Sequence, residues 1–239
     1  MKKKFVPVLA AGALIVVIIC FMLLGSIIEK YTPSKEHMNL SDYYNLSSEQ
    51  DVALILNNQV LDAKGKLLNG TVYLDYETVR SNLNDRFYWD HNENKLLYTT
   101  AIDLISADAD STSYYVTKDS HSLDHAVVKA DAQTAYIAID FLKLYSDFSY
   151  EVLESPNRVI LTTAWGDYTT APAKQKTQVR QKGGIKSPIL ADIDKNTEVT
   201  VLETGDTWTK ISTADGIIGY VKSKALGTTS AKTLTSDYV

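Results

Sequence analysis

Cysteine is almost absent from this sequence, and its scarcity excludes several kinds of chemistry. Among 239 residues the single cysteine is Cys20, which lies inside a long apolar run. The rest of the chain therefore forms no disulfide bond and carries no thiol nucleophile, so its stability must come from hydrophobic cores. Two isoleucines precede Cys20, whereas a lipid-modified cysteine follows a small residue. We interpret Cys20 as a thiol within a membrane segment.

Patterns that bind metals or catalyse reactions are also scarce. His121 and His125 stand one helical turn apart, but no third zinc ligand accompanies them, which favours a solvated surface. The run from Asp90 to Asn94 imitates the start of a calcium loop, yet the glycine and glutamate that complete such a loop are missing. No Gly-x-Ser-x-Gly, phosphate-binding loop or His-Glu-x-x-His occurs. We expect no metal, no cofactor and no catalytic residue.

Positive charge is scarce in the middle of the chain. Residues 31–173 hold 10 basic and 21 acidic groups, a net charge of −11, whereas residues 174–239 hold 10 basic and 7 acidic groups, a net charge of +3. Proteins that bind nucleic acid need basic surfaces to neutralise phosphates, so the acidic body excludes that class of partner. The basic C-terminal part suits anionic polymers, although the same charge also serves solubility.

The sequence has one long apolar run, and it follows three lysines at the N-terminus. The run covers 24 uncharged residues, 5–28, and as a helix would be about 36 Å long, enough to cross a bilayer. We expect residues 1–30 to be cytoplasmic lysines and an uncleaved transmembrane helix, with a cleaved signal peptide as the alternative. The lysines place residues 31–239 outside the cytoplasm, beginning with a juxtamembrane linker over 31–50.

An internal repeat follows within residues 51–168. Residues 71–101 align with residues 134–164 at a constant offset of 63, without a gap. Each copy predicts a short strand, a helix and a hairpin, which gives an α+β domain built from a duplicated unit. The identical pairs are Thr71/Thr134, Tyr73/Tyr136, Asn94/Asn157 and the closing Thr-Thr-Ala of both copies.

The first copy of the repeat contains Asn69-Gly70, Val72-Tyr73-Leu74, Phe87-Tyr88-Trp89-Asp90 and Lys95-Leu96-Leu97. On these residues it resembles the copper amine oxidase N-terminal-like domain of Gram-positive envelope proteins, with Asp75 in place of the family's proline. Despite the name of the family, the resemblance implies a stalk or scaffold and no copper chemistry.

A linker is predicted over 169–176 and a polar tail over 228–239. Between them stand Val179-Arg180, Gly183-Gly184, Trp208-Thr209-Lys210-Ile211, Gly216-Ile217-Ile218-Gly219-Tyr220-Val221 and Ser223-Lys224-Ala225-Leu226. On these segments residues 177–227 resemble a bacterial SH3 domain, an all-β barrel.

The SH3 resemblance implies binding to cell-wall peptidoglycan or to another envelope protein. The candidate ligand-binding residues are Trp208, Tyr220, Arg180 and Lys186. Trp208 also suits the core or rim of the barrel, and both readings stay open for Tyr220, which stands where the family usually has tryptophan. We expect the acidic domain to be a spacer that holds the barrel tens of ångströms from the membrane.

The order of anchor, repeat and SH3 barrel also resembles the N-terminal half of membrane-bound family-18 glycoside hydrolases, the chitinase-like group. Their catalytic Asp-x-x-Asp-x-Asp-x-Glu is absent here, since Ser111 and Thr112 follow Asp110. The sequence thus predicts a single-pass, non-catalytic envelope protein. The alternative hypothesis is the non-catalytic front portion of such a hydrolase, without its barrel.

Overall fold

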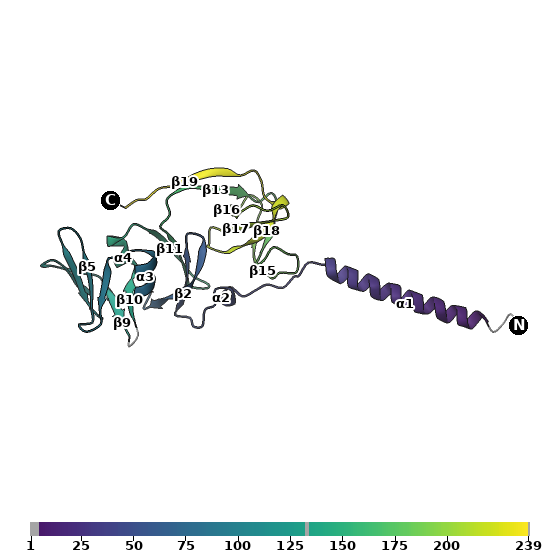
Figure 1. Ribbon diagram of the computed structural model, residues 1–239, viewed down its shortest axis with the longest axis horizontal. Coiled ribbons are helices and arrows are strands. Elements are labelled where there is room, and N and C mark those ends of the chain that lie inside the picture. Colours follow the sequence, from purple (N-terminus) through teal and green to yellow (C-terminus); the bar gives the residue numbers. More distant parts are fainter. Residues whose placement is uncertain (1–4, 132–133, 239) are drawn as a thin grey trace.

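The computed structural model describes residues 5–131 and 134–238, which form one long helix and two β-rich units (Figure 1). Helix α1 (Phe5–Tyr31) has 27 residues and is about 40 Å long. Its side chains from Leu14 onward are mostly exposed, and the window Leu14–Tyr31 is long and apolar enough to cross a membrane. Length and composition therefore allow either a signal anchor or a membrane span.

The first unit is built on a seven-stranded mixed sheet in which strands from distant parts of the chain are neighbours. Its order is β11-β12-β1-β2-β3-β10-β9, and β1 pairs in parallel with β12 while the other pairs are antiparallel. The strands are β1 (Asp51–Leu56), β2 (Gln59–Leu68), β3 (Thr71–Asp75), β9 (Val128–Ala130), β10 (Ala135–Ala138), β11 (Ser149–Leu153) and β12 (Arg158–Thr162).

A five-stranded antiparallel sheet completes this unit, and two helices connect the sheets through an aromatic core. Phe141 of α4 contacts the rings of Phe87 in β4 and Tyr114 in β7, with centroids 6.4 and 5.1 Å away. All three side chains are buried. The elements are α3 (Tyr76–Asn82), α4 (Ile139–Tyr145), β4 (Phe87–Asp90), β5 (Lys95–Thr99), β6 (Leu104–Asp108), β7 (Ser113–Val116) and β8 (Asp119–Ser122).

The two segments of the sequence repeat have the same order of elements but different neighbours. The first contains β3, α3, β4 and β5, and the second contains β10, α4, β11 and β12. Strands β4 and β5 belong to the five-stranded sheet, whereas β12 pairs with β1 in the other sheet. Asp75 caps α3 by accepting a 3.0 Å hydrogen bond from the Thr78 N–H, which gives a role to the residue that replaces the family's proline.

The second unit is a seven-stranded sheet in the order β15-β14-β18-β17-β16-β13-β19. Two of its strands overlap the segments that the sequence predicted as a linker (169–176) and a tail (228–239): β13 includes residues 169–172, and β19 covers residues 230–234, so these parts are strands. The backbone of β13 pairs with β16 on one edge and with β19 on the other. Strand β19 is exposed throughout, so its sequence carries no apolar pattern that would predict a strand. The strands are β13 (Gly166–Pro172), β14 (Thr177–Arg180), β15 (Ile189–Ile193), β16 (Glu198–Glu203), β17 (Trp208–Ser212), β18 (Ile218–Lys222) and β19 (Ser230–Leu234), with a short 3-10 turn, η1 (Ser223–Ala225), after β18.

The prediction of a juxtamembrane linker is also wrong for residues 34–44, which we call the strap. The Ser34 N–H donates to the Ile185 carbonyl at 2.8 Å. Ile189 of β15 accepts the Met38 N–H at its carbonyl and donates its own N–H to the Glu36 carbonyl, both at 2.8 Å. The strap ends in α2 (Leu40–Tyr43) and the buried Tyr44. These backbone bonds, and the partly buried Met38, Leu40 and Tyr43 that pack on its core, make the strap part of the second unit.

The strap places the second unit, and not the acidic first unit, next to α1, which is the opposite of the order that a spacer requires. Only Thr32 and Pro33 separate the end of α1 from Ser34, whose N–H is already bonded to the second unit. Three residue steps reach at most about 10 Å, so the second unit lies next to the end of α1. The acidic first unit lies on its far side (Figure 1). The prediction of a spacer between helix and barrel is therefore wrong.

A junction between the two units is buried and hydrogen-bonded. Its apolar centre consists of Tyr44, Ala53, Ile55 and Ile218. The Tyr44 hydroxyl donates to the Gly216 carbonyl at 3.0 Å, and burial raises the pKa of Tyr44, so this hydroxyl remains a neutral donor.

An arginine of the first unit holds the β17–β18 loop at this junction. The buried Arg158 donates from Nε to the Asp215 carbonyl at 2.8 Å and lies 3.3 Å from its carboxylate. Gly216 has a φ of +80°, and a Cβ at this position would lie 3.1 Å from Cγ1 of Ile160. The loop therefore needs glycine both for its backbone and for its close approach to β12.

We predict that Gly216→Ala destabilises the protein more than Gly70→Ala. Both glycines have positive φ, so alanine costs about 1–2 kcal/mol of backbone strain at each. A Cβ at Gly70 has open space around it, whereas at Gly216 it presses on Ile160. Denaturant unfolding of the full chain in detergent measures both, and equal losses would contradict the packing at the junction.

A buried carboxylate fixes the start of β1. Asp51 is bonded to the Lys66 ammonium at 2.7 Å and accepts the N–H groups of Ser47 and Ser48 at 2.8 and 2.9 Å. Burial opposes ionisation, but the hydrogen bonds from Lys66, Ser47 and Ser48 outweigh it and lower the pKa of Asp51 to about 2. The charged form therefore stabilises the folded state.

We predict that Asp51→Asn lowers the free energy of unfolding at neutral pH by roughly 1–2 kcal/mol. Because the folded pKa lies below the unfolded value of 3.8, the stabilisation is present above about pH 4 and disappears as the pH falls towards 2. Unfolding curves of both proteins between pH 7 and pH 2 should converge. A constant difference across this range would show that Asp51 does not act through its charge.

Candidate functional site

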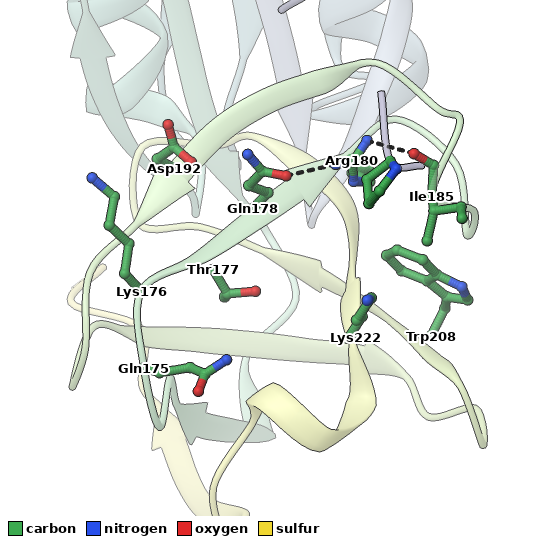
Figure 2. A pocket seen from close by; sticks show the side chains of 10 residues that line it. Gln175, Lys176, Thr177, Gln178, Arg180, Ile185, Asp192, Trp208 and Lys222 are labelled. Atoms are coloured by element: carbon green, nitrogen blue, oxygen red, sulfur yellow. Dashed lines mark hydrogen bonds between the residues drawn. The ribbon is translucent and has the colours of Figure 1, made fainter. Parts of the chain in front are cut away.

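The candidate site is a cavity of about 360 Å³ on the second unit (Figure 2). Strand β14, the loop after it and the β17–β18 hairpin form its walls, and Pro33, which directly precedes the strap, closes one side. Two lysines and Arg180 outnumber Asp192, so the lining is basic. The lining residues are Pro33, Gln175, Lys176, Thr177, Gln178, Arg180, Ile185, Asp192, Trp208 and Lys222.

Trp208 forms an aromatic wall of this cavity. It lies on the first position of β17, is half-buried, and pairs across the strands with Lys222 of β18. A Cβ at Gly183 would lie 3.2 Å from the Trp208 Cβ, so the glycine loop packs closely on this side chain. The sequence left core, rim and ligand contact open for Trp208, and the structure places it at the rim, partly open to a ligand.

Arg180 positions the site and has little capacity to bind a ligand. It is only 4% exposed. One guanidinium nitrogen donates to the carbonyls of Ile185 and Ser187 at 3.0 and 2.6 Å, and the other donates to Ser34 and Gln178 at 3.0 and 2.6 Å. Burial lowers the pKa of Arg180. These bonds hold the loop and the strap on β14, so the predicted ligand contact becomes a positioning role.

The other two predicted residues lie outside this cavity. Lys186 is exposed, and its ammonium donates to the carbonyl of Glu29 at the end of α1. Tyr220 lines a separate cavity of about 520 Å³ together with Tyr43, Asn58, Lys182 and Lys210, among others. The structure therefore does not bring Trp208, Tyr220, Arg180 and Lys186 together in one site.

One face of the β17–β18 hairpin borders both cavities. The side chains of the hairpin point alternately into the core of the second unit, where Ile211 and Val221 are buried, and towards this outer face. Three cross-strand pairs lie on the outer face, namely Trp208–Lys222, Lys210–Tyr220 and Ser212–Ile218. The first pair borders the Trp208 cavity and the second borders the Tyr220 cavity. Lysines therefore accompany both aromatic rings along this face.

Sequence reasoning missed Pro33, Lys176 and Lys222 as lining residues. Pro33 and Lys176 lie in segments that were predicted to be linkers, because their polar and proline-containing composition is typical of loops. Lys222 had a usable signal, since it stands two residues after Tyr220 and so shares its face of the strand.

Metal binding has no structural support in residues 5–131 and 134–238, where no group of three His, Cys, Asp or Glu side chains is close enough to hold an ion. The exposed His121 stacks on Tyr114 with ring centroids 5.2 Å apart. His125 lies between Asp124 and Asp140, at 2.6 and 3.1 Å. The two histidines therefore make separate contacts.

Comparison with known proteins identifies only the C-terminal part of the chain. No curated protein matches the sequence. Solved structures that are similar include NlpC2 from Trichomonas vaginalis (16% identity, TM-score 0.24, covering 60% of this chain and 43% of that one) and NlpC1 from the same organism (14%, 0.24, 60% and 41%). The chain thus spans less than half the length of either, and TM-scores this low carry no argument about fold or function.

A family model matches the segment that forms most of the Trp208 cavity. The resemblance of the first unit to copper amine oxidase N-terminal-like repeats stays a prediction, and so does the resemblance of the chain to family-18 hydrolases. The matched segment contains strands β14 to β18, and hence Trp208, Tyr220, Arg180 and Lys186. Residues 176–227 are a bacterial SH3 domain.

Proposed function

We propose that this protein is a membrane-anchored, non-catalytic envelope protein whose SH3 domain binds an anionic cell-wall polymer, peptidoglycan in the first instance, at the Trp208 cavity. The observation that carries the proposal is the combination of a half-buried tryptophan with Lys176 and Lys222 in one preformed cavity of this domain. The indole offers a flat apolar surface, and the ammonium groups attract carboxylates.

The walls of the cavity are held before any ligand arrives. Arg180 bonds the loop that contains Ile185 and the strap residue Ser34 to β14. A ligand therefore loses little affinity to ordering of the protein, because preorganisation reduces the entropy cost of binding.

The short distance between α1 and the cavity limits where this binding takes place. If α1 spans the membrane, Pro33, which lines the cavity, lies two residues beyond the end of the helix. Two residue steps reach about 7 Å, so Pro33 lies close to the extracytoplasmic face of the membrane and the polymer must approach that face. The proposed role is therefore to bind wall material close to the membrane.

We predict that Trp208→Ala weakens the binding of the full chain to purified peptidoglycan about tenfold. The variant removes the largest apolar contact surface of the cavity, and such aromatic anchors dominate binding energies. Sedimentation of the detergent-solubilised chain with insoluble peptidoglycan measures the bound fraction against polymer concentration.

Tyr88→Ala is the matched control, because Tyr88 is an aromatic residue that is 57% exposed on the five-stranded sheet, away from the cavity. Lys222→Gln, which keeps the aliphatic stem but removes the charge, should weaken binding and reduce its dependence on salt. Equal binding by the Trp208→Ala and Tyr88→Ala variants, or no sedimentation of the unmodified chain, would overturn the proposal.

A further inference from the structure

A third cavity, of about 540 Å³, lies where the two units meet, and neither unit forms it alone. The first unit contributes the β1–β2 turn with Asn57 and Asn58, part of β12 and Glu151 of β11. The second unit contributes β13, the last residue of β17, Ser212, and the β17–β18 loop that follows it. Such inter-domain cavities are common places for small ligands.

The walls of this cavity are fixed by side-chain hydrogen bonds. Asn57 donates from Nδ2 to the Thr163 hydroxyl at 2.8 Å, and its Oδ1 accepts the N–H groups of Thr163 and Ala164 at 2.9 and 3.1 Å. The Trp165 indole N–H donates to Asp147 at 3.1 Å, which fixes the orientation of the ring. These bonds fix the turn that contains Asn57 and the Trp165 ring on one side of the cavity.

The chemistry of the lining is aromatic and acidic. Trp165 and Tyr168 supply two rings, and Glu151 and Asp167 supply two carboxylates. No lysine, arginine or histidine is among its described lining residues. Within residues 5–131 and 134–238, neither carboxylate has an ion-pair partner, although Asp167 accepts the Thr233 hydroxyl at 2.6 Å.

We infer that this inter-domain cavity binds a sugar unit with a free ammonium group, an amino sugar whose nitrogen is not acetylated. The carboxylates complement the ammonium charge. The aromatic rings suit both a cation and the apolar face of a pyranose ring. Asn58, a lining residue shared with the Tyr220 cavity, has an amide that can bind hydroxyl groups. This site is separate from the Trp208 cavity, and the inference does not depend on the function proposed there.

The three tryptophans of the chain allow a direct test by ¹⁹F NMR of the full chain, labelled with 5-fluorotryptophan, in detergent micelles. Trp165 reports on the inter-domain cavity, Trp208 reports on the other site, and the buried Trp89 reports on the fold. Replacement of each tryptophan by phenylalanine assigns its signal. The probes are D-glucosamine, its neutral analogue N-acetyl-D-glucosamine, and Nα-acetyl-L-lysine amide, which carries an ammonium group without a sugar.

We expect glucosamine to shift the Trp165 signal saturably while the Trp89 signal stays unchanged. N-acetylglucosamine should need at least about tenfold higher concentrations, because it lacks the charge that pairs with the carboxylates. The double variant Glu151→Gln/Asp167→Asn should raise the half-saturating concentration of glucosamine by a similar factor. Glu154→Gln, an exposed carboxylate change on the same hairpin but outside the cavity, should leave it unchanged.

Each other outcome overturns the inference. Equal responses to glucosamine and N-acetylglucosamine would exclude recognition of the ammonium group. Tighter binding of the lysine amide would assign the cavity to a peptide side chain, and a shift confined to Trp208 would place the sugar in the other site. An effect of Glu154→Gln as large as that of the double variant would show that glucosamine responds to the general surface charge and not to the carboxylates of the cavity.

Discussion

The position of the β17–β18 hairpin between the two units is the constraint on which the rest of the structure depends. One face of the hairpin buries Ile211 and Val221 in the SH3 core, while the other presents Ile218 to the junction with Tyr44 and Ile55. A hairpin with two buried roles cannot shift its register without exposing one of these apolar sets. Its loop is held in turn by the buried Arg158.

This arrangement makes the protein a single assembly in which functional surfaces are shared between distant segments. The strap, β13 and β19 all join the sheet or surface of the SH3 domain from outside residues 176–227. The C-terminal segment also reaches the first unit, where Asp237 pairs with Lys143 at 2.8 Å. The cavities consequently combine side chains that are far apart in the sequence, and the SH3 domain lies beside the end of α1.

Local sequence patterns predicted the elements whose signals are local. The 24-residue uncharged run predicted the apolar helix, and the alternation around Trp208 and Tyr220 predicted the strands of the SH3 domain. The candidate site was predicted only in part, since Trp208 lines the cavity but Tyr220 and Lys186 do not. Arg180 illustrates the reason. A basic residue in a family motif can contact a ligand or can bond to the chain itself, as Arg180 does with four hydrogen bonds. Only the burial of the side chain distinguishes the two roles.

The sequence by itself determined the apolar N-terminal helix, the acidic and basic division of the chain and the SH3 segment, because composition and side-chain alternation are properties of neighbouring residues. Only the tertiary structure decided that residues 34–44 pack as a strap, that β13 and β19 extend the sheet, and that the acidic unit lies beyond the SH3 domain. These features depend on backbone hydrogen bonds between distant segments. Such bonds use N–H and carbonyl groups that every residue except proline carries, so they leave little trace in the sequence.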